Sequence, residues 1–234
     1  MTRVLVPVEI LEGKTVSPGL MQLLGPVDVT VLGYHVLPEQ TPPDQARLQY
    51  EERATAALED LTEEFRAAGG EVNYRLVFTH DREQTLERIA DEVGARALAI
   101  SGVTGDIDSL LVSLSGDVAV DRILEFVIEV IGDREIDVTL LLAGDTEEGM
   151  DDRLDTATNR LREAGIDVET SLSTDSPFES LMDAVPNHDA IVMGESAPSL
   201  RSLVFGDESE RVAAASVGPV LVVRSDESSD DESV

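Results

Sequence analysis

The sequence predicts an α/β protein in which one parallel-sheet unit occurs twice. Three observations support this prediction. Short apolar segments rich in Val, Leu and Ile alternate with segments of helical periodicity. The apolar segments are nearly continuous, which is typical of parallel strands covered by helices on both faces. The same order of segments starts again after residue 106, which indicates an internal repeat.

The first unit is expected to contain four strands. They are predicted over residues 4–8, 27–36, 72–78 and 95–101. A short helix should join the first two strands. Apolar residues spaced three and four apart predict a long amphipathic helix over residues 44–68, which Gly69 and Gly70 end, and a further helix that ends at Gly94.

The second unit repeats this order. Strands are predicted over residues 109–115 and 137–142, with a helix over residues 123–131 between them, and Asp-Val-Thr opens the second strand of both units. Residues 161–168 match residues 65–72. Five further positions of the second unit match five positions of the first at a constant offset in sequence. In the first unit they are Leu86, Ile89, Ala90, Val93 and Gly102, and in the second unit they are Phe178, Leu181, Met182, Val185 and Gly194.

Beyond that match only the second unit continues. A helix is predicted near residues 207–216 and a last strand over residues 220–223. We therefore expect a truncated unit at residues 1–105, without its last helix and strand, and a complete unit at residues 106–224. Residues 225–234 are expected to be a disordered acidic tail, because the segment is low in complexity and rich in Asp and Glu.

The acidic composition excludes some classes of binding partner. The chain has 48 Asp and Glu against 17 Lys and Arg, a formal net charge of −31, and Lys14 is its one lysine. Such a surface repels nucleic acids and anionic membranes. We predict a halophilic protein, because molar salt screens the self-repulsion of these charges.

Metal binding and membrane insertion are not expected. Cys is absent, and His35, His80 and His188 lie too far apart in sequence to form a local metal motif. No apolar run approaches the 18 or more residues that a membrane span needs, and no signal-peptide pattern precedes the first strand. These features predict a cytoplasmic protein.

Several motifs of the second unit resemble the universal stress protein family. They are Ile191-Val192-Met193-Gly194, Phe205-Gly206-Asp207, Glu210-Arg211-Val212 and the strand from Pro219 to Arg224. The resemblance covers residues 109–224 and, in the first unit, residues 3–105. It implies two Rossmann-like domains of the adenine nucleotide alpha hydrolase-like type in tandem. It also implies that the strand at residues 220–223 pairs between domains, as an intramolecular pseudo-dimer or in a homo-oligomer such as a dimer.

One branch of that family binds ATP or a related nucleotide such as AMP through a loop of Gly-x-x-Gly, nine residues and Gly-Ser or Gly-Thr. In the second unit this loop is degenerate. Ala197 stands in place of the second glycine after Gly194, the spacer is shorter by one residue, and Asp207 follows Gly206. Ser115 stands where the branch has an Asp. The candidate residues of the first unit keep the acid and two glycines, and they are Glu9, Gly102 and Gly105.

These residues predict a non-enzymatic stress-response protein that acts by binding, without catalytic residues and without a nucleotide cofactor held in the usual way. An adenine-nucleotide-binding stress sensor with weak or no ATP hydrolysis is the alternative. The resemblance further implies a protein partner such as a transporter.

Overall fold

The computed structural model describes residues 2–102, 104–144, 150–197 and 218–225. The described strands are β1 (Arg3–Glu9), β2 (Asp28–Val36), β3 (Val72–Thr79), β4 (Ala97–Ile100), β5 (Ser109–Ser113), β6 (Asp137–Ala143), β7 (Val168–Ser173), β8 (Ala190–Gly194) and β9 (Val220–Val223). The α-helices are α1 (Pro18–Leu23), α2 (Pro43–Ala67), α3 (Arg82–Val93), α4 (Val120–Ile131), α5 (Met150–Glu163) and α6 (Pro177–Ala184). Short 3₁₀ turns occupy Ile10–Glu12 and Val185–Asn187.

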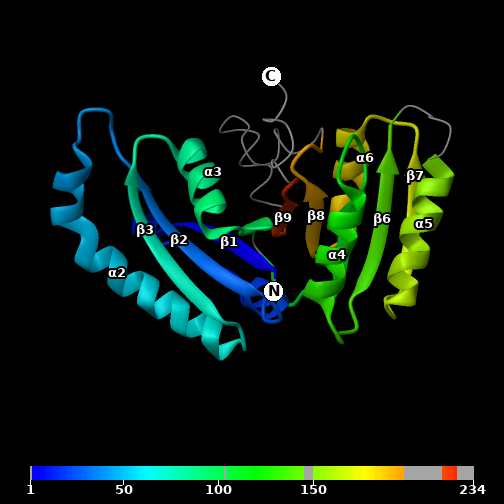
Figure 1. Cartoon of the computed structure of the whole chain (residues 1–234), viewed down its shortest axis with the longest axis horizontal. Coiled ribbons are helices and arrows are strands. Elements are labelled where there is room, and N and C mark those ends of the chain that lie inside the picture. Colours follow the sequence, from blue (N-terminus) through cyan, green and yellow to red (C-terminus); the bar gives the residue numbers. More distant parts are fainter. Residues whose placement is uncertain (1, 103, 145–149, 198–217, 226–234) are drawn as a thin grey trace, which may run out of the picture.

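All nine strands form one continuous sheet in the order β3-β2-β1-β4-β9-β8-β5-β6-β7, which runs across the width of Figure 1. The first half of the chain contributes β1 to β4, and the second half repeats that order with β5 to β8. Strands within each half pair in parallel. The expected α/β fold with a mostly parallel sheet is confirmed.

Helices cover both faces of the first half. On one face, the Leu58 side chain of α2 lies against Gly33 of β2, where a Cβ would come within 2.7 Å of it. On the opposite face, Leu86 and Ile89 of α3 cluster with Leu5 and Leu32. Adjacent strand residues point to opposite faces, so β1 and β2 are buried on both sides, as their continuous apolar runs predict.

The ends of the helices follow local sequence signals. The Asp81 side chain accepts a hydrogen bond from the Gln84 backbone N–H at the start of α3. Gly94 ends that helix in the left-handed conformation, with φ of 64°, which glycine adopts without a steric penalty. The Ser176 side chain caps α6 in the same way as Asp81 caps α3.

The two halves join at an antiparallel pair. β4 and β9 align from Ala97 with Val223 to Ile100 with Val220, while β8 and β9 are parallel. Residues 220–223 were expected to pair between the two units, and in the structure they pair with β4 of the first half within one chain. Homo-oligomer formation stays a prediction, as do the division into two domains and the truncation of the first. The helix expected near residues 207–216 and residues 226–234 of the acidic tail lie outside the described residues.

Charged and polar contacts add to this junction. Arg224, directly after β9, lies 2.7 Å from the Asp91 carboxylate of α3. Arg134 donates hydrogen bonds to the carbonyls of Gln22 (2.6 Å) and Leu23 (2.8 Å) at the end of α1, and to that of Ile131 (3.0 Å) at the end of α4. One guanidinium thus binds the carboxyl ends of a helix from each half.

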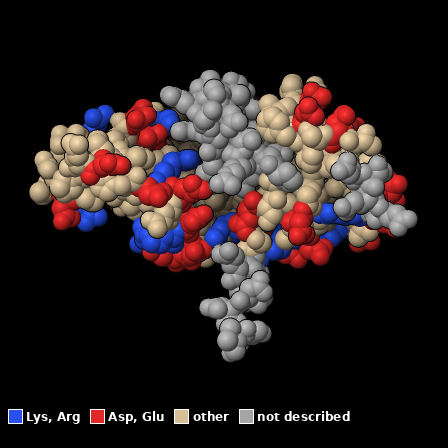
Figure 2. Space-filling model, turned by 90° about the horizontal axis from the view of Figure 1, so that it is seen from above, with Lys and Arg blue, Asp and Glu red and all other residues tan. Residues whose placement is uncertain are grey.

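Acidic side chains are scattered over both halves of the face shown in Figure 2 rather than gathered at one place. Within the described parts of the chain, no helix combines the length and the apolar character needed to cross a bilayer.

Candidate functional site

The predicted loop residues of the second half lie at the carboxyl end of β8. Gly194 is the last residue of this strand. The Val118 side chain covers it, because a Cβ on Gly194 would come within 2.9 Å of two Val118 carbons and 3.4 Å of Ile123 Cδ1. The Ala197 N–H donates to the Gly194 carbonyl at 3.0 Å, so these two residues share one tight turn. Ala197 is buried and does not adopt a positive φ.

Ser115 is also buried, but its hydroxyl is engaged elsewhere. Its Oγ accepts a hydrogen bond of 2.9 Å from the backbone N–H of Ala143 at the end of β6. The hydroxyl therefore holds the carboxyl ends of two neighbouring strands together. Gly206 and Asp207 lie outside the described residues.

Two of the candidate residues of the first half, Glu9 and Gly105, also contact other parts of the protein. The Glu9 carboxylate lies 2.7 Å from Nζ of Lys14. The Gly105 carbonyl packs on α1 so closely that a Cβ on Gly19 would lie 2.0 Å from it. Gly102 follows β4 and is half-buried. Because β4 and β9 are antiparallel, these residues and the Gly194 turn belong to opposite edges of the sheet at the junction.

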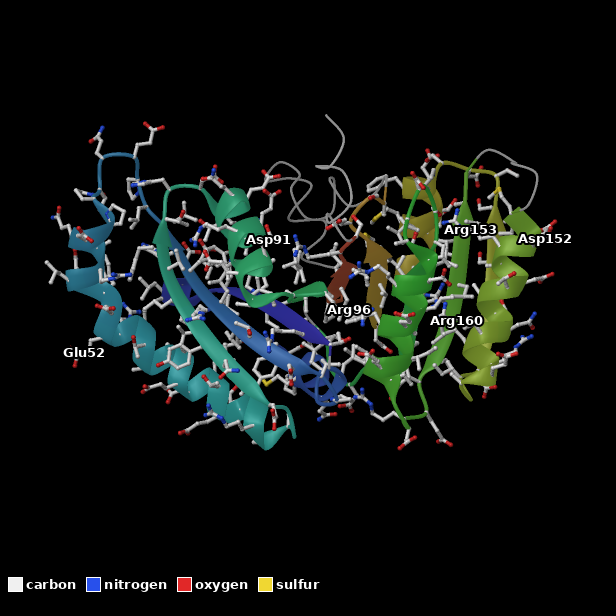
Figure 3. All side chains as sticks on the ribbon, in the orientation of Figure 1. Glu52, Asp91, Arg96, Asp152, Arg153 and Arg160 are labelled. Carbon is white, nitrogen blue, oxygen red and sulfur yellow. The ribbon has the colours of Figure 1, made fainter. Side chains whose placement is uncertain are left out.

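A cleft of about 730 Å³ lies beside Val118, between the first residues of α4 and the helix α5. Its charged residues are three acids and three bases, namely Asp117, Asp121, Arg122, Asp152, Arg153 and Arg160. Arg153 donates two hydrogen bonds of 3.3 Å to the Gly116 carbonyl, and Arg160 contacts Asp121 at 2.5 Å. Figure 3 shows Arg153 and Arg160 on the side of α5 that faces α4. Equal numbers of acids and bases leave this cleft without a dominant charge.

An ion-pair network connects this region to the junction. Glu125 of α4 lies 3.1 Å from Arg96, which directly precedes β4, and 3.1 Å from Arg160 of α5. In Figure 3, Arg96 and Arg160 flank α4. The hydrogen bond from Arg96, followed by that from Arg160, holds the pKa of Glu125 below its ordinary value of 4.5.

The three histidines occupy separate places. His188 lies 2.8 Å from both the Ala184 carbonyl and the Thr139 hydroxyl. His80 lies 3.3 Å from the Leu37 carbonyl, and the His35 ring packs on the edges of Tyr50 and Phe78. Within the described ranges, no histidine is hydrogen-bonded to a carboxylate, and no group of three or more His, Asp and Glu is placed to hold a metal ion.

Sequence reasoning did not find Val118 or the Glu9–Lys14 pair. The Lys14 pairing had a signal, since the chain's one lysine lies five residues after the acid. Val118 had none, because its contact with Gly194 depends on how the turn after β5 folds over β8.

Comparison with known proteins gives one family match. Residues 126–224 match the model of the universal stress protein family. No curated protein sequence matches the chain. Among solved structures, a universal stress protein from Archaeoglobus fulgidus DSM 4304 is similar at 18% identity and a TM-score of 0.66, covering 96% of this chain and 97% of that one.

A functionally unknown protein from Pseudomonas aeruginosa PAO1 is similar at 14% identity and a TM-score of 0.53, covering 96% of this chain and 92% of that one. At such identities these structures establish the α/β fold alone. The family match is made by the sequence of the second half. The similarity to the universal stress protein family therefore rests on residues 126–224, less than half of the chain.

Proposed function

We propose that this chain is a stress-response protein that acts by binding and association rather than by catalysis, and that it does not bind ATP through the family's loop. The observation that carries the proposal is the packing of Val118 on Gly194. A glycine in a phosphate-binding loop leaves its backbone open to the ligand. Here a side chain fills the space next to that glycine.

Two further contacts support the proposal. The Ser115 hydroxyl, at the position of the family's Asp, is buried and accepts a hydrogen bond from the Ala143 N–H, and it offers no carboxylate to a ligand. The turn from Gly194 to Ala197 is closed by a hydrogen bond of its own.

Titration calorimetry of the full chain with Mg-ATP in 2 M KCl tests the proposal. We expect a dissociation constant no better than about 1 mM, since a lost charge-assisted hydrogen bond alone costs about 1.5 to 3 kcal/mol, or roughly one to two decades of affinity. The double variant Ala197→Gly, Asp207→Ser is the matched control and should recover little. A micromolar constant for the wild-type chain contradicts the proposal and favours the nucleotide sensor.

The partner of such a binding protein is best sought in molar KCl, because the acidic surface is screened there. Affinity capture with the full chain at 2 M KCl, compared with capture at 0.1 M KCl, should enrich a protein partner such as a transporter at the higher salt. A partner that is captured only at 0.1 M salt points instead to non-specific charge attraction.

A further inference from the structure

Three arginines from three different elements gather in one groove of the first half. The groove has a volume of about 420 Å³ and its charged residues are Arg3 of β1, Arg66 of α2, Arg75 of β3 and Glu92 of α3. Thr30 and Asn73, which are register partners on β2 and β3, also line it. We call this the arginine groove. It lies away from Gly194 and Val118, and no part of the proposed function uses it.

Two of these arginines are unpaired, which is unusual in a chain with 48 acidic residues and 17 basic ones. Of the arginines within the described ranges, Arg53, Arg66 and Arg75 are the ones without a hydrogen bond or an ion pair, and two of these three line the arginine groove. Arg66 and Arg75 are exposed to solvent. Arg3 is anchored, because it donates a hydrogen bond of 2.6 Å to the Val93 carbonyl.

The second half provides an internal comparison. A groove of about 720 Å³ lies at the corresponding place, where Arg162 and Val168 match Arg66 and Val72 in the repeat. Ser109 and Ser171 replace the other two arginines, and the acids in this groove are Asp137, Asp167 and Glu169. Arg162 is engaged there, since it donates to the Val168 carbonyl at 3.1 Å.

The fold therefore produces a groove in both halves, but the cationic character belongs to the first half alone. A guanidinium presents paired N–H donors in a planar fork, which matches phosphate oxygens. The Thr30 hydroxyl and the Asn73 amide can donate further hydrogen bonds to an anion held between the arginines. Because the groove is open and polar, it suits a small, highly charged ligand better than an apolar one.

We propose that the arginine groove binds a small multivalent oxyanion carrying a phosphate or pyrophosphate group. Arg66 and Arg75 contribute the free guanidinium donors, and Arg3, at the start of β1, adds a third guanidinium that also lies 3.8 Å from the Asp28 carboxylate. The repulsion from the rest of the acidic surface is long-range, so salt screens it, whereas hydrogen bonds at contact distance persist.

The test uses the full-length chain in 1 M KCl and sodium pyrophosphate as the probe, with binding measured by calorimetry and by ³¹P NMR. Arg75→Ala should weaken binding at least about tenfold, since a charge-assisted hydrogen bond is lost. Arg75→Lys should weaken binding less than Arg75→Ala does, because lysine keeps the positive charge but lacks the paired N–H donors of the guanidinium. Arg162→Ala, in the corresponding groove of the second half, is the matched control and should change affinity less than about twofold. Circular dichroism confirms that each variant is folded.

Absence of saturable pyrophosphate binding, or equal binding by wild type and Arg75→Ala, overturns the proposal. Tighter binding of an Asp/Glu-rich peptide than of pyrophosphate, with the same dependence on Arg75, also overturns it and assigns the groove to an acidic protein segment. An ATP titration keeps this test separate from that of the proposed function, because ATP bound through the groove is lost in Arg75→Ala, whereas ATP bound at the Gly194 turn is not.

Discussion

The close contact between Gly194 and Val118 leads to a quantitative prediction for the variant Gly194→Ala. The new Cβ would lie 2.9 Å from Val118 Cβ and Cγ1, whereas carbon atoms pack best at about 3.5 to 4.0 Å. Gly194 does not have a positive φ, so the added methyl group brings no backbone strain. We expect the variant to lower the free energy of unfolding by about 1 to 3 kcal/mol, as overpacking of a core does.

Val118→Ala removes both methyl groups of Val118, of which Cγ1 would lie 2.9 Å from a Cβ on Gly194. Alone it should lower the free energy of unfolding by about 1.5 kcal/mol, at about 0.8 kcal/mol for each buried methylene-sized group. The double variant Gly194→Ala, Val118→Ala should lose less stability than the sum of the two single effects, because the contact with Cγ1 is removed, while the Cβ of residue 118 still lies 2.9 Å from the new methyl group. This predicts a coupling energy of at least about 0.5 kcal/mol between the two sites.

Urea unfolding in 2 M KCl, followed by far-UV circular dichroism, measures all four proteins. Gly105→Ala is the matched control, since a Cβ there meets nothing within 4 Å and its φ is not positive. That control should change stability by less than about 1 kcal/mol. Additive effects of Gly194→Ala and Val118→Ala would refute the contact, and with it the observation that carries the proposed function.

Three further predictions concern the junction and the surface charge. Arg134→Met should lower the free energy of unfolding by about 2 kcal/mol in the same urea assay, because it leaves carbonyls at the ends of α1 and α4 without their charged donor; no loss would contradict this role. Glu125→Gln should cost about 0.5 to 1 kcal/mol at pH 7 and low salt. Since the pKa of Glu125 is lowered in the folded protein, this contribution is present above its ordinary value of 4.5 and should vanish as pH falls below it, which thermal melts from pH 7 to pH 3 measure. Finally, the net charge of −31 predicts that the thermal midpoint rises from 0.1 to 2 M KCl in calorimetric scans, and an unchanged midpoint would contradict the predicted halophilic behaviour.

Much of the fold follows from local sequence. The predicted strand over residues 72–78 corresponds to β3 at Val72–Thr79, and the predicted helix over residues 44–68 corresponds to α2 at Pro43–Ala67. Both carry a clear period of apolar residues or a run of β-branched ones. Gly94 ends α3 where the sequence indicates. These features depend on neighbouring residues, which is why a single sequence shows them.

Other features depend on contacts between distant segments. Helix α5 was implied only by the repeat, through the match of residues 161–168 with residues 65–72, and it received no bounds of its own. Its buried Leu154, Ala157 and Leu161 follow helical spacing, but the segment is otherwise highly polar. The strand at residues 220–223 was expected to pair between the two units, but an apolar run of four residues does not show which strand it joins or in which direction. The candidate site was chosen by glycine spacing, which cannot show that Val118 covers Gly194 or that Arg66 and Arg75 share a groove.

The place of β9 has a consequence for how the protein is made. Among the nine described strands it comes last in sequence, yet it lies at the centre of the sheet, between β4 and β8. A nascent chain therefore exposes the unpaired edges of β4 and β8 until the final strand has been synthesised, and exposed edges invite pairing with other chains. Pairing Ala97 with Val223 closes a very long loop, so we expect union of the two half-sheets to be a late and slow step of folding. A chain that stops short of residue 220 should yield two separate half-sheets that aggregate. The short strand β9 thus decides whether the two halves join into one sheet or aggregate through the open edges of β4 and β8.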